Sequence, residues 1–136
     1  MPRQPDGRRP YRLMITGSRH ATPVMIQTVR KAVQRAHELG FAILVGDAPG
    51  VDAAVVAECN RLGVRYACVC VAGRGRNQEA RVVVNAPVAS YTERDRWMVT
   101  RADRVLAIHN GYSRGTLAAY RFSLALQKPA DLLQPR

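Results

Sequence analysis

The chain has 136 residues, of which 47% are hydrophobic, and it carries a formal net charge of +11. This length and composition predict a folded domain with a buried core rather than a disordered chain. No apolar run approaches the roughly 18 residues that a membrane span needs. We therefore expect a cytoplasmic protein without membrane contact. Its positive charge favours an anionic partner such as phosphate, a nucleotide or nucleic acid.

The N-terminal residues 1–10 are rich in Arg and Pro and lack the apolar core of a secretory signal. We expect them to form a flexible basic leader ahead of a single domain at 11–136. The cysteines Cys59, Cys68 and Cys70 lie in apolar segments, which is typical of buried free thiols in a reducing cytosol. Because no second Cys or His pair accompanies Cys68 and Cys70, we expect no metal, and we expect no separate cofactor.

Apolar strands alternate with helices along the chain. Thr22 and Pro23 are typical of an N-cap and a first helical turn, and Gly40 of the following stop. Thr92 is the expected cap of a later helix, with Asp95 three residues on. The expected strands are 11–16, 41–45, 64–71, 103–109 and 130–133, and the expected helices are 23–39, 52–62, 91–101 and 116–126. The stretch 72–90 is broken by Gly and Pro, and a short extra strand at 82–84 is left open.

This alternation predicts an α/β fold: a Rossmann-like, doubly wound, mainly parallel sheet of about five strands with helices on both faces. Right-handed crossovers favour the strand order 3-2-1-4-5. In such a sheet the ligand lies beyond the carboxyl ends of the strands, where the winding reverses. Here that point falls between the first and fourth strands.

The loops that follow these two strands are rich in glycine, hydroxyl and arginine side chains. Glycine lets backbone N–H groups approach an anion, and the N-terminus of the next helix adds a favourable partial charge. We therefore expect a phosphate cradle, although the same glycines would also serve plain tight turns. The candidate ligands of the phosphate are Gly17, Ser18, Arg19, Gly111, Ser113, Gly115 and Thr116.

A third loop, 46–52, follows the second strand, and we expect its Gly46, Asp47 and Gly50 to belong to the same ligand site. We expect Asp52 to be the N-cap of the helix that begins there. A carboxylate beside a phosphate would repel it, so Asp47 suits ribose hydroxyls better, as the acidic residue of dinucleotide folds does.

Two familiar motifs are excluded. Residues 111–115 match G-x-S-x-G, but a nucleophile elbow needs an acid and then a histidine later in the chain, and His20, His37 and His109 all precede Ser113. The same segment is not a Walker A loop, because no lysine follows Gly115.

Four segments, in order, carry a resemblance to a known group: ITGSR at 15–19, GDAPGVD at 46–52, YTERDRWM at 91–98 and ADRVLAIHNGYSRGT at 102–116. Together they resemble the SLOG superfamily, which contains DprA, the LOG phosphoribohydrolases and the YpsA-related proteins, and the similarity is greatest to the small YpsA-related branch. The resemblance implies a Rossmann-like fold, a nucleotide-derived ligand and often a dimer. It also implies that Gly115 and Thr116 face phosphate and that Arg94 and Asp95 belong to the site.

The chain departs from the LOG pattern at a catalytic position. The glutamate of LOG enzymes is replaced by Ala119, whereas the arginine of the M-x-x-R element is present as Arg101. LOG activity therefore does not carry over directly. The YpsA-related branch has Arg-Asn where this chain has Arg94 and Asp95, so Asp95 is available as a carboxylate.

Three functions remain open. The first is a sensor or binding module for a nucleotide-derived ligand, in which Arg19 and Arg94 make charge-assisted hydrogen bonds to phosphate. The second is an N-glycosidase acting on a nucleoside 5′-monophosphate, with Asp95 and Asp47 as catalytic carboxylates. The third is single-stranded DNA binding as in DprA. An aromatic content of 6% argues against it, because proteins that bind single strands stack the bases on aromatic side chains. The last helix has apolar residues on most of its faces. Such a helix is either deeply buried or part of a subunit interface, so we also expect a homodimer or a higher homo-oligomer.

Overall fold

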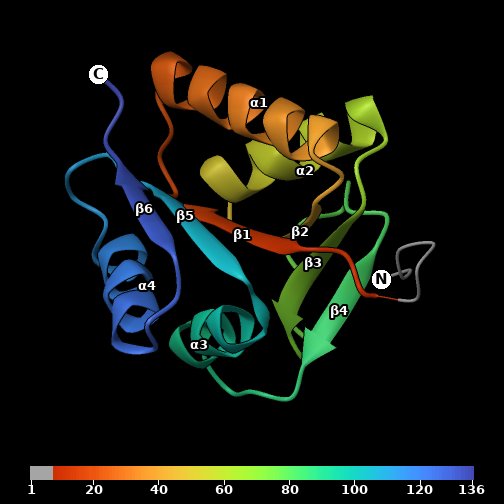
Figure 1. The fold of residues 1–136 in the computed structure, drawn as a ribbon. Helices are drawn as coiled ribbons and strands as arrows, with labels where there is room; N and C mark the ends of the chain where they lie inside the picture. Colours follow the sequence, from red (N-terminus) through yellow and green to blue (C-terminus); the bar gives the residue numbers. More distant parts are fainter. Residues whose placement is uncertain (1–7) are drawn as a thin grey trace.

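The computed structural model describes residues 8–136, and these form a six-stranded sheet in which every neighbouring pair of strands is parallel (Figure 1). The order is β4-β3-β2-β1-β5-β6. The five predicted strands keep their positions relative to one another, but the count and the full order differ from the prediction, because a sixth strand, β4, pairs with β3 and becomes the edge of the sheet. The strands are β1 Arg12–Gly17, β2 Ala42–Gly46, β3 Tyr66–Val71, β4 Val83–Ala86, β5 Arg104–Ile108 and β6 Ala130–Leu133.

Two helices lie on each face of the sheet, as Figure 1 shows, so the predicted doubly wound architecture is confirmed. The helices α1 Pro23–Glu38 and α2 Val51–Leu62 pack together on one face. On the other face α3 Tyr91–Arg101 packs against α4 Arg114–Ala125. Each of the predicted helices forms, with ends that differ by a residue or two.

Two helix starts show how local sequence sets the element boundaries. The Thr22 hydroxyl accepts a hydrogen bond from Met25 N at 3.2 Å, as predicted for the cap of α1. The predicted cap of α3, Thr92, is wrong: the helix already begins at Tyr91, and Ser90 caps it by accepting from Glu93 N at 3.1 Å. A hydroxyl caps a helix only from the residue ahead of the first turn, and Thr92 lies within that turn.

The central strands are buried on both faces, which explains their unbroken apolar sequences. Side chains alternate across a strand, so Leu13 and Ile15 of β1 face the α1–α2 core, whereas Met14 faces the α3–α4 core. Cys68 follows the first pattern as a buried free thiol, and burial raises its pKa to about 12. Such a thiol is protonated at neutral pH and packs as a small apolar side chain.

The end of β1 is packed directly against the start of α2. Val51 N donates to the Ser18 carbonyl at 3.0 Å, and a Cβ on Gly17 would lie 2.5 Å from the Val51 side chain. Gly50 has a φ of 78°, and a Cβ there would collide with the Arg19 carbonyl. Glycine is required at both positions for the loop and the helix to approach this closely.

The predicted leader is only partly visible, because residues 1–7 lie outside the described part of the chain. Within the described part, Arg9 makes two bonds to the Asp103 carboxylate, at 2.6 and 2.7 Å, and Pro10 is buried. Over residues 8–136 no helix has both the length and the apolar content to cross a membrane.

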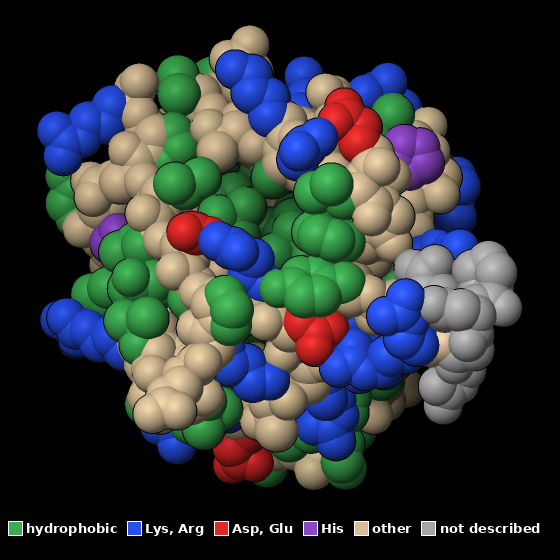
Figure 2. All heavy atoms as spheres, in the orientation of Figure 1, with side chains coloured by type: hydrophobic (Ala, Val, Ile, Leu, Met, Phe, Trp, Pro, Cys, Tyr) green, Lys and Arg blue, Asp and Glu red, His purple; other side chains and the backbone are tan. Residues whose placement is uncertain are grey.

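An apolar hollow lies beside α1, where the β5–β6 side of the sheet carries no helix on that face (Figure 2). It has a volume of about 320 Å³, and its lining includes Leu13, Phe41 and Leu106. Figure 2 also shows Lys and Arg side chains spread around the edge of this face, with few acidic side chains between them.

We expect Gly17→Ala to lower the free energy of unfolding by about 1–3 kcal/mol, because the added methyl group overpacks the contact with Val51. Urea unfolding measures this directly. Gly115→Ala is the matched control, since no atom lies within 4 Å of the position its Cβ would take. Equal stability of the Gly17→Ala protein and the wild type would contradict this account of the junction.

Candidate functional site

The loops after β1 and β5 meet at one edge of the sheet. Their strands are direct neighbours, and Ser18 N donates to the Ile108 carbonyl at 3.2 Å. In return the Ser18 hydroxyl accepts from Asn110 N at 3.0 Å. Ser18 is completely buried, so its side chain joins the two loops rather than facing solvent.

A pocket of about 380 Å³ lies where these loops meet the starts of α3 and α4. It receives side chains from the carboxyl ends of β1, β2 and β5. The predicted site residues that line it are Gly17, Arg19, Arg94, Asp95, Ser113, Gly115 and Thr116. Those that do not line it are Ser18, Gly46, Asp47, Gly50 and Gly111. Lining residues that sequence reasoning missed include Arg76, Tyr91, Arg114 and Asp52.

The first turn of α4 presents free N–H groups to this pocket. Ser113 caps the helix by accepting from Thr116 N at 3.4 Å, and Asn110 Oδ1 accepts from Ser113 N at 3.1 Å. The N–H groups of Arg114 and Gly115 have no intrahelical acceptor, as is general for a first turn. Because no atom lies within 4 Å of a Cβ built on Gly115, an anion has room to reach them.

His109 fixes the loop that leads into α4. Its Nδ1 accepts from Gly111 N at 3.2 Å, so Nε2 carries the proton and donates to the Ser113 carbonyl at 2.9 Å. Gly111 has a φ of 96°, and a Cβ there would lie 2.9 Å from Gln134 Nε2. The backbone conformation of the turn therefore requires glycine at this position.

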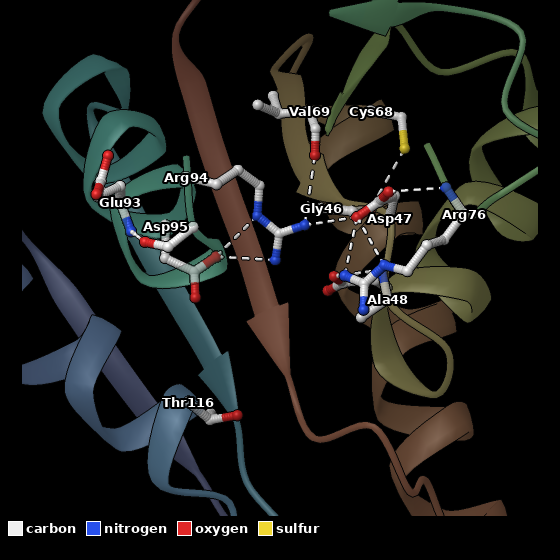
Figure 3. Close-up of polar contacts among 12 residues, drawn as sticks. Gly46, Asp47, Ala48, Cys68, Val69, Arg76, Glu93, Arg94, Asp95 and Thr116 are labelled. Atoms are coloured by element: carbon white, nitrogen blue, oxygen red, sulfur yellow. Dashed lines mark hydrogen bonds and ion pairs between the residues drawn. The ribbon is translucent and has the colours of Figure 1, made fainter. Parts of the chain in front are cut away.

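A buried guanidinium lies beneath the pocket, between two carboxylates (Figure 3). Arg94 Nη1 is 2.6 Å from Asp47 Oδ1, and Arg94 Nη2 is 3.0 Å from Asp95 Oδ1. Nη1 also contacts the Val69 carbonyl at 3.5 Å. Burial alone would lower the pKa of Arg94, but Asp95, Asp52 and Asp47 outweigh it and raise that pKa. The arginine is therefore permanently charged and is paired on both sides.

Asp47 is bound by protein groups on both oxygens. Arg94 and Arg76 share Oδ1, and Arg76 N donates to Oδ2 at 2.9 Å. Burial acts to raise the pKa of Asp47, but the hydrogen bonds from Arg76 prevail and hold it below its usual range. Asp47 therefore positions the two arginines, and it is not among the residues that line the pocket.

Arg76 is the second cation of this network, and it comes from the irregular segment between β3 and β4. Its guanidinium carbon lies 3.9 Å from the centre of the Tyr91 ring, which fixes the side chain across the edge of the pocket. Neither periodicity nor a motif marks this segment in the sequence, so only the chain's path past β3 reveals its role.

The prediction that Asp52 is the N-cap of α2 is wrong. The helix begins at Val51, and Gly50 occupies the cap position. The Asp52 side chain instead turns inward and is 3% exposed. Oδ2 accepts from Ala48 N at 3.2 Å, whereas Oδ1 has no hydrogen-bond partner among the described residues. Burial raises the pKa of Asp52 to about 7.

Asp95 is the carboxylate that is best placed to reach a ligand. Its side chain remains 19% exposed, and both of its contacts to Arg94 are made by Oδ1. In Figure 3 its other oxygen points away from the Arg94 guanidinium. Burial raises the pKa of Asp95 even though Arg94 opposes the shift.

No metal centre is built from the described residues. Over 8–136 no three His, Cys, Asp or Glu side chains lie together as a metal site would require.

Several solved structures share the Rossmann-like fold of this chain at low sequence identity. A molybdenum cofactor binding protein from the phototrophic bacterium Rippkaea orientalis superposes with a TM-score of 0.81 at 19% identity, covering 94% of this chain and 78% of that one. The Moco carrier protein of Chlamydomonas reinhardtii gives 0.80 at 15% identity, covering 94% and 78%. DNA processing protein A from Helicobacter pylori gives 0.73 at 18% identity, covering 93% and 66%. Neither a protein-family profile nor a curated protein sequence matches this chain.

We expect Arg94→Met to lower the free energy of unfolding by about 3–5 kcal/mol at pH 7.5, because it leaves buried carboxylates without their counter-charge. Without the arginine, the pKa values of these carboxyls rise in the folded protein. The loss should therefore be smaller at pH 5, where protonation removes more of their charge. Urea unfolding at the two pH values measures both effects. Arg96→Met, on the exposed face of the same helix, is the control, and an equal loss in the two variants would contradict the proposed network.

Proposed function

We propose that this chain binds a phosphorylated, nucleotide-derived small molecule, with the phosphate held at the first turn of α4. The observation that carries the proposal is the pocket itself, in which open N–H groups at Arg114 and Gly115 face the same cavity as Arg19. A helix N-terminus and convergent arginines are both general devices for binding phosphate.

The size and place of the pocket support a small molecule as ligand. A volume of about 380 Å³ is within the usual range for small-molecule sites, and the carboxyl edge of a doubly wound sheet is where such ligands bind. Two of the similar solved structures are described as a binding protein and a carrier of the molybdenum cofactor. This chain shares their fold, and its pocket lies at the edge of the sheet that is suited to a ligand of similar kind.

The charge of the protein supports an anionic ligand. The formal net charge of +11 draws anions towards the molecule, and at the pocket Arg19, Arg76 and Arg114 add local positive charge. Thr116 lies beside Arg114 and Gly115, with its hydroxyl 2.8 Å from the Ser113 hydroxyl. Since one of these hydroxyls donates to the other, the pair leaves one O–H as a further donor for a phosphate oxygen.

We expect Gly115→Asp to weaken phosphate binding by at least about tenfold, because it places a carboxylate where the anion binds. The new side chain has room, and an acidic residue in a first helical turn is favourable, so the fold should remain intact. Calorimetry with inorganic phosphate, AMP, ADP-ribose and NAD measures the affinities.

Gly115→Asn is the matched control for that variant, since it has the same size without the charge. Equal affinities in the Asp and Asn variants would refute the phosphate position. If none of these probes binds the wild type more tightly than roughly millimolar, the proposed function itself fails.

A second candidate function, hydrolysis of an N-glycosidic bond, is favoured by Asp95. This carboxyl lines the pocket, has one oxygen free of Arg94 and has a pKa that burial raises above its usual value, the direction that favours a general acid or base. We expect Asp95→Asn to abolish release of free base from a nucleoside 5′-monophosphate if this activity exists.

Chromatography of the products tests this activity, and Asp131→Asn, on the exposed strand β6, is the control. Undiminished cleavage by the Asp95→Asn protein would remove Asp95 from any catalytic role. Binding of the nucleotide without release of base by the wild type would leave the first proposal alone.

A further inference from the structure

Asp52 is a buried acid whose charge helps to balance Arg94, but neither the capping of α2 nor the proposed phosphate site accounts for its free oxygen. Helix α2 does not need it as a cap, and one bond from Ala48 N satisfies only Oδ2. Oδ1 is buried and has no partner among the described residues, and the residue lines the pocket. An unpaired carboxylate oxygen in the interior is costly, so its retention beside a cavity indicates a ligand that supplies the missing donor.

The position of Asp52 is set by close packing under the pocket. A Cβ on Gly46 would lie 2.6 Å from Asp52 Oδ2 and 2.8 Å from the Arg94 guanidinium carbon. Glycine at this point allows both side chains to pack against the end of β2. Arg94 directs its hydrogen bonds to Asp47, Asp95 and the Val69 carbonyl, and none reaches Asp52 Oδ1.

The pocket has donors on one side and acceptors on the other. The α4 end, beyond β5, offers N–H groups, hydroxyls and Arg114, whereas Asp52 follows β2. Strand β1 lies between β2 and β5, so these ends are about two strand spacings, or roughly 10 Å, apart. The hydroxyls of a sugar phosphate lie close to the ester, but a heterocycle attached to that sugar carries its N–H groups at the far end of the molecule.

We propose that Asp52 recognises the heterocyclic end of the ligand: its free oxygen accepts an N–H from a planar nitrogen heterocycle, while the phosphate of the same molecule is bound at α4. This inference rests on the proposed phosphate site. It adds a residue that determines specificity and restricts the ligand to phosphate esters that carry a ring with an N–H donor.

Protonation of Asp52 should be coupled to binding. The charged groups that face it are Arg94 and Asp95 from α3 and Asp47 from the loop after β2, with the Cys68 thiol of β3 nearby. In the free protein its pKa is about 7, so much of it is protonated below that pH. A ligand N–H favours the ionised form, so binding should release a proton below pH 7 and strengthen as the pH rises, levelling off near 7.

Calorimetry with three nucleotides and inorganic phosphate tests the inference. AMP and GMP carry N–H donors on the base, whereas purine riboside 5′-monophosphate has none. We expect the wild type to prefer AMP or GMP to the donor-free nucleotide by about tenfold or more, equivalent to about 1.4 kcal/mol. We expect this preference to increase from pH 5 to pH 7, because Asp52 ionises over this range. The ionisation of the phosphate is common to all three nucleotides, so it cancels in the comparison.

Asp52→Asn replaces the free acceptor with an amide that still accepts from Ala48 N. We expect this variant to lose the preference and its pH dependence, and to bind inorganic phosphate within twofold of the wild type. Glu58→Gln is the control, because Glu58 lies on the same helix, is also 3% exposed and is remote from the pocket. It should keep the preference.

Three results would overturn the assignment of Asp52. The first is that the Asp52→Asn protein still prefers AMP or GMP to the donor-free nucleotide. The second is that this preference of the wild type decreases as the pH rises, because protonated Asp52 would then be the hydrogen-bond donor. The third is that inorganic phosphate binds while no nucleotide binds more tightly. That last result would leave the phosphate site intact, whereas failure of inorganic phosphate and every nucleotide to bind would reject the proposed function as well.

Discussion

The pairing of Arg94 on two sides organises the end of the sheet at which the pocket lies. An isolated charge in the interior costs several kcal/mol, so this guanidinium is stable there only because Asp47 and Asp95 flank it. Those partners come from different elements, one after β2 and one within α3. The single cation therefore fixes the first turns of α3 against the ends of β2 and β3. Gly46 makes the arrangement possible, because any larger residue would occupy the space of the guanidinium.

This network divides the acidic residues of the site into different roles. Asp47 forms ion pairs with Arg76 and Arg94 and has a lowered pKa, so it remains negatively charged. Asp95 keeps one oxygen free of Arg94, and Asp52 keeps one that has no hydrogen-bond partner within residues 8–136. The three carboxylates lie close enough to influence one another, and the two that are least well paired have raised pKa values. A cation-rich entrance above acidic groups suits a ligand that is anionic at one end and donates hydrogen bonds at the other.

Proteins that share this fold at low sequence identity are described as binding different ligands. Proteins described as binding the molybdenum cofactor and as binding single-stranded DNA share this fold at 15–19% identity. A common sheet therefore carries different ligands, as is general for widely used folds. In this chain the features that would distinguish the ligand come from the segments beyond the carboxyl ends of the strands: Arg76 between β3 and β4, Asp52 after β2 and the Ser113 cap of α4.

The sequence by itself determined the four helices, five of the six strands and the order of those strands. Apolar runs that end in glycine, an N-cap hydroxyl ahead of Pro23 and alternation of strands with helices are local signals, and the parallel sheet follows from them with little freedom. The same local logic placed the loops after β1 and β5 together, because neighbouring parallel strands end at one edge. The tertiary structure decided what each polar side chain does at that edge. Asp47 and Asp52 stand five positions apart in one loop-to-helix segment, yet Asp47 is paired with two arginines, whereas Asp52 Oδ1 has no donor among the described residues. That difference depends on Arg76 and Arg94, which reach the same point from distant parts of the chain, and no local pattern encodes their meeting.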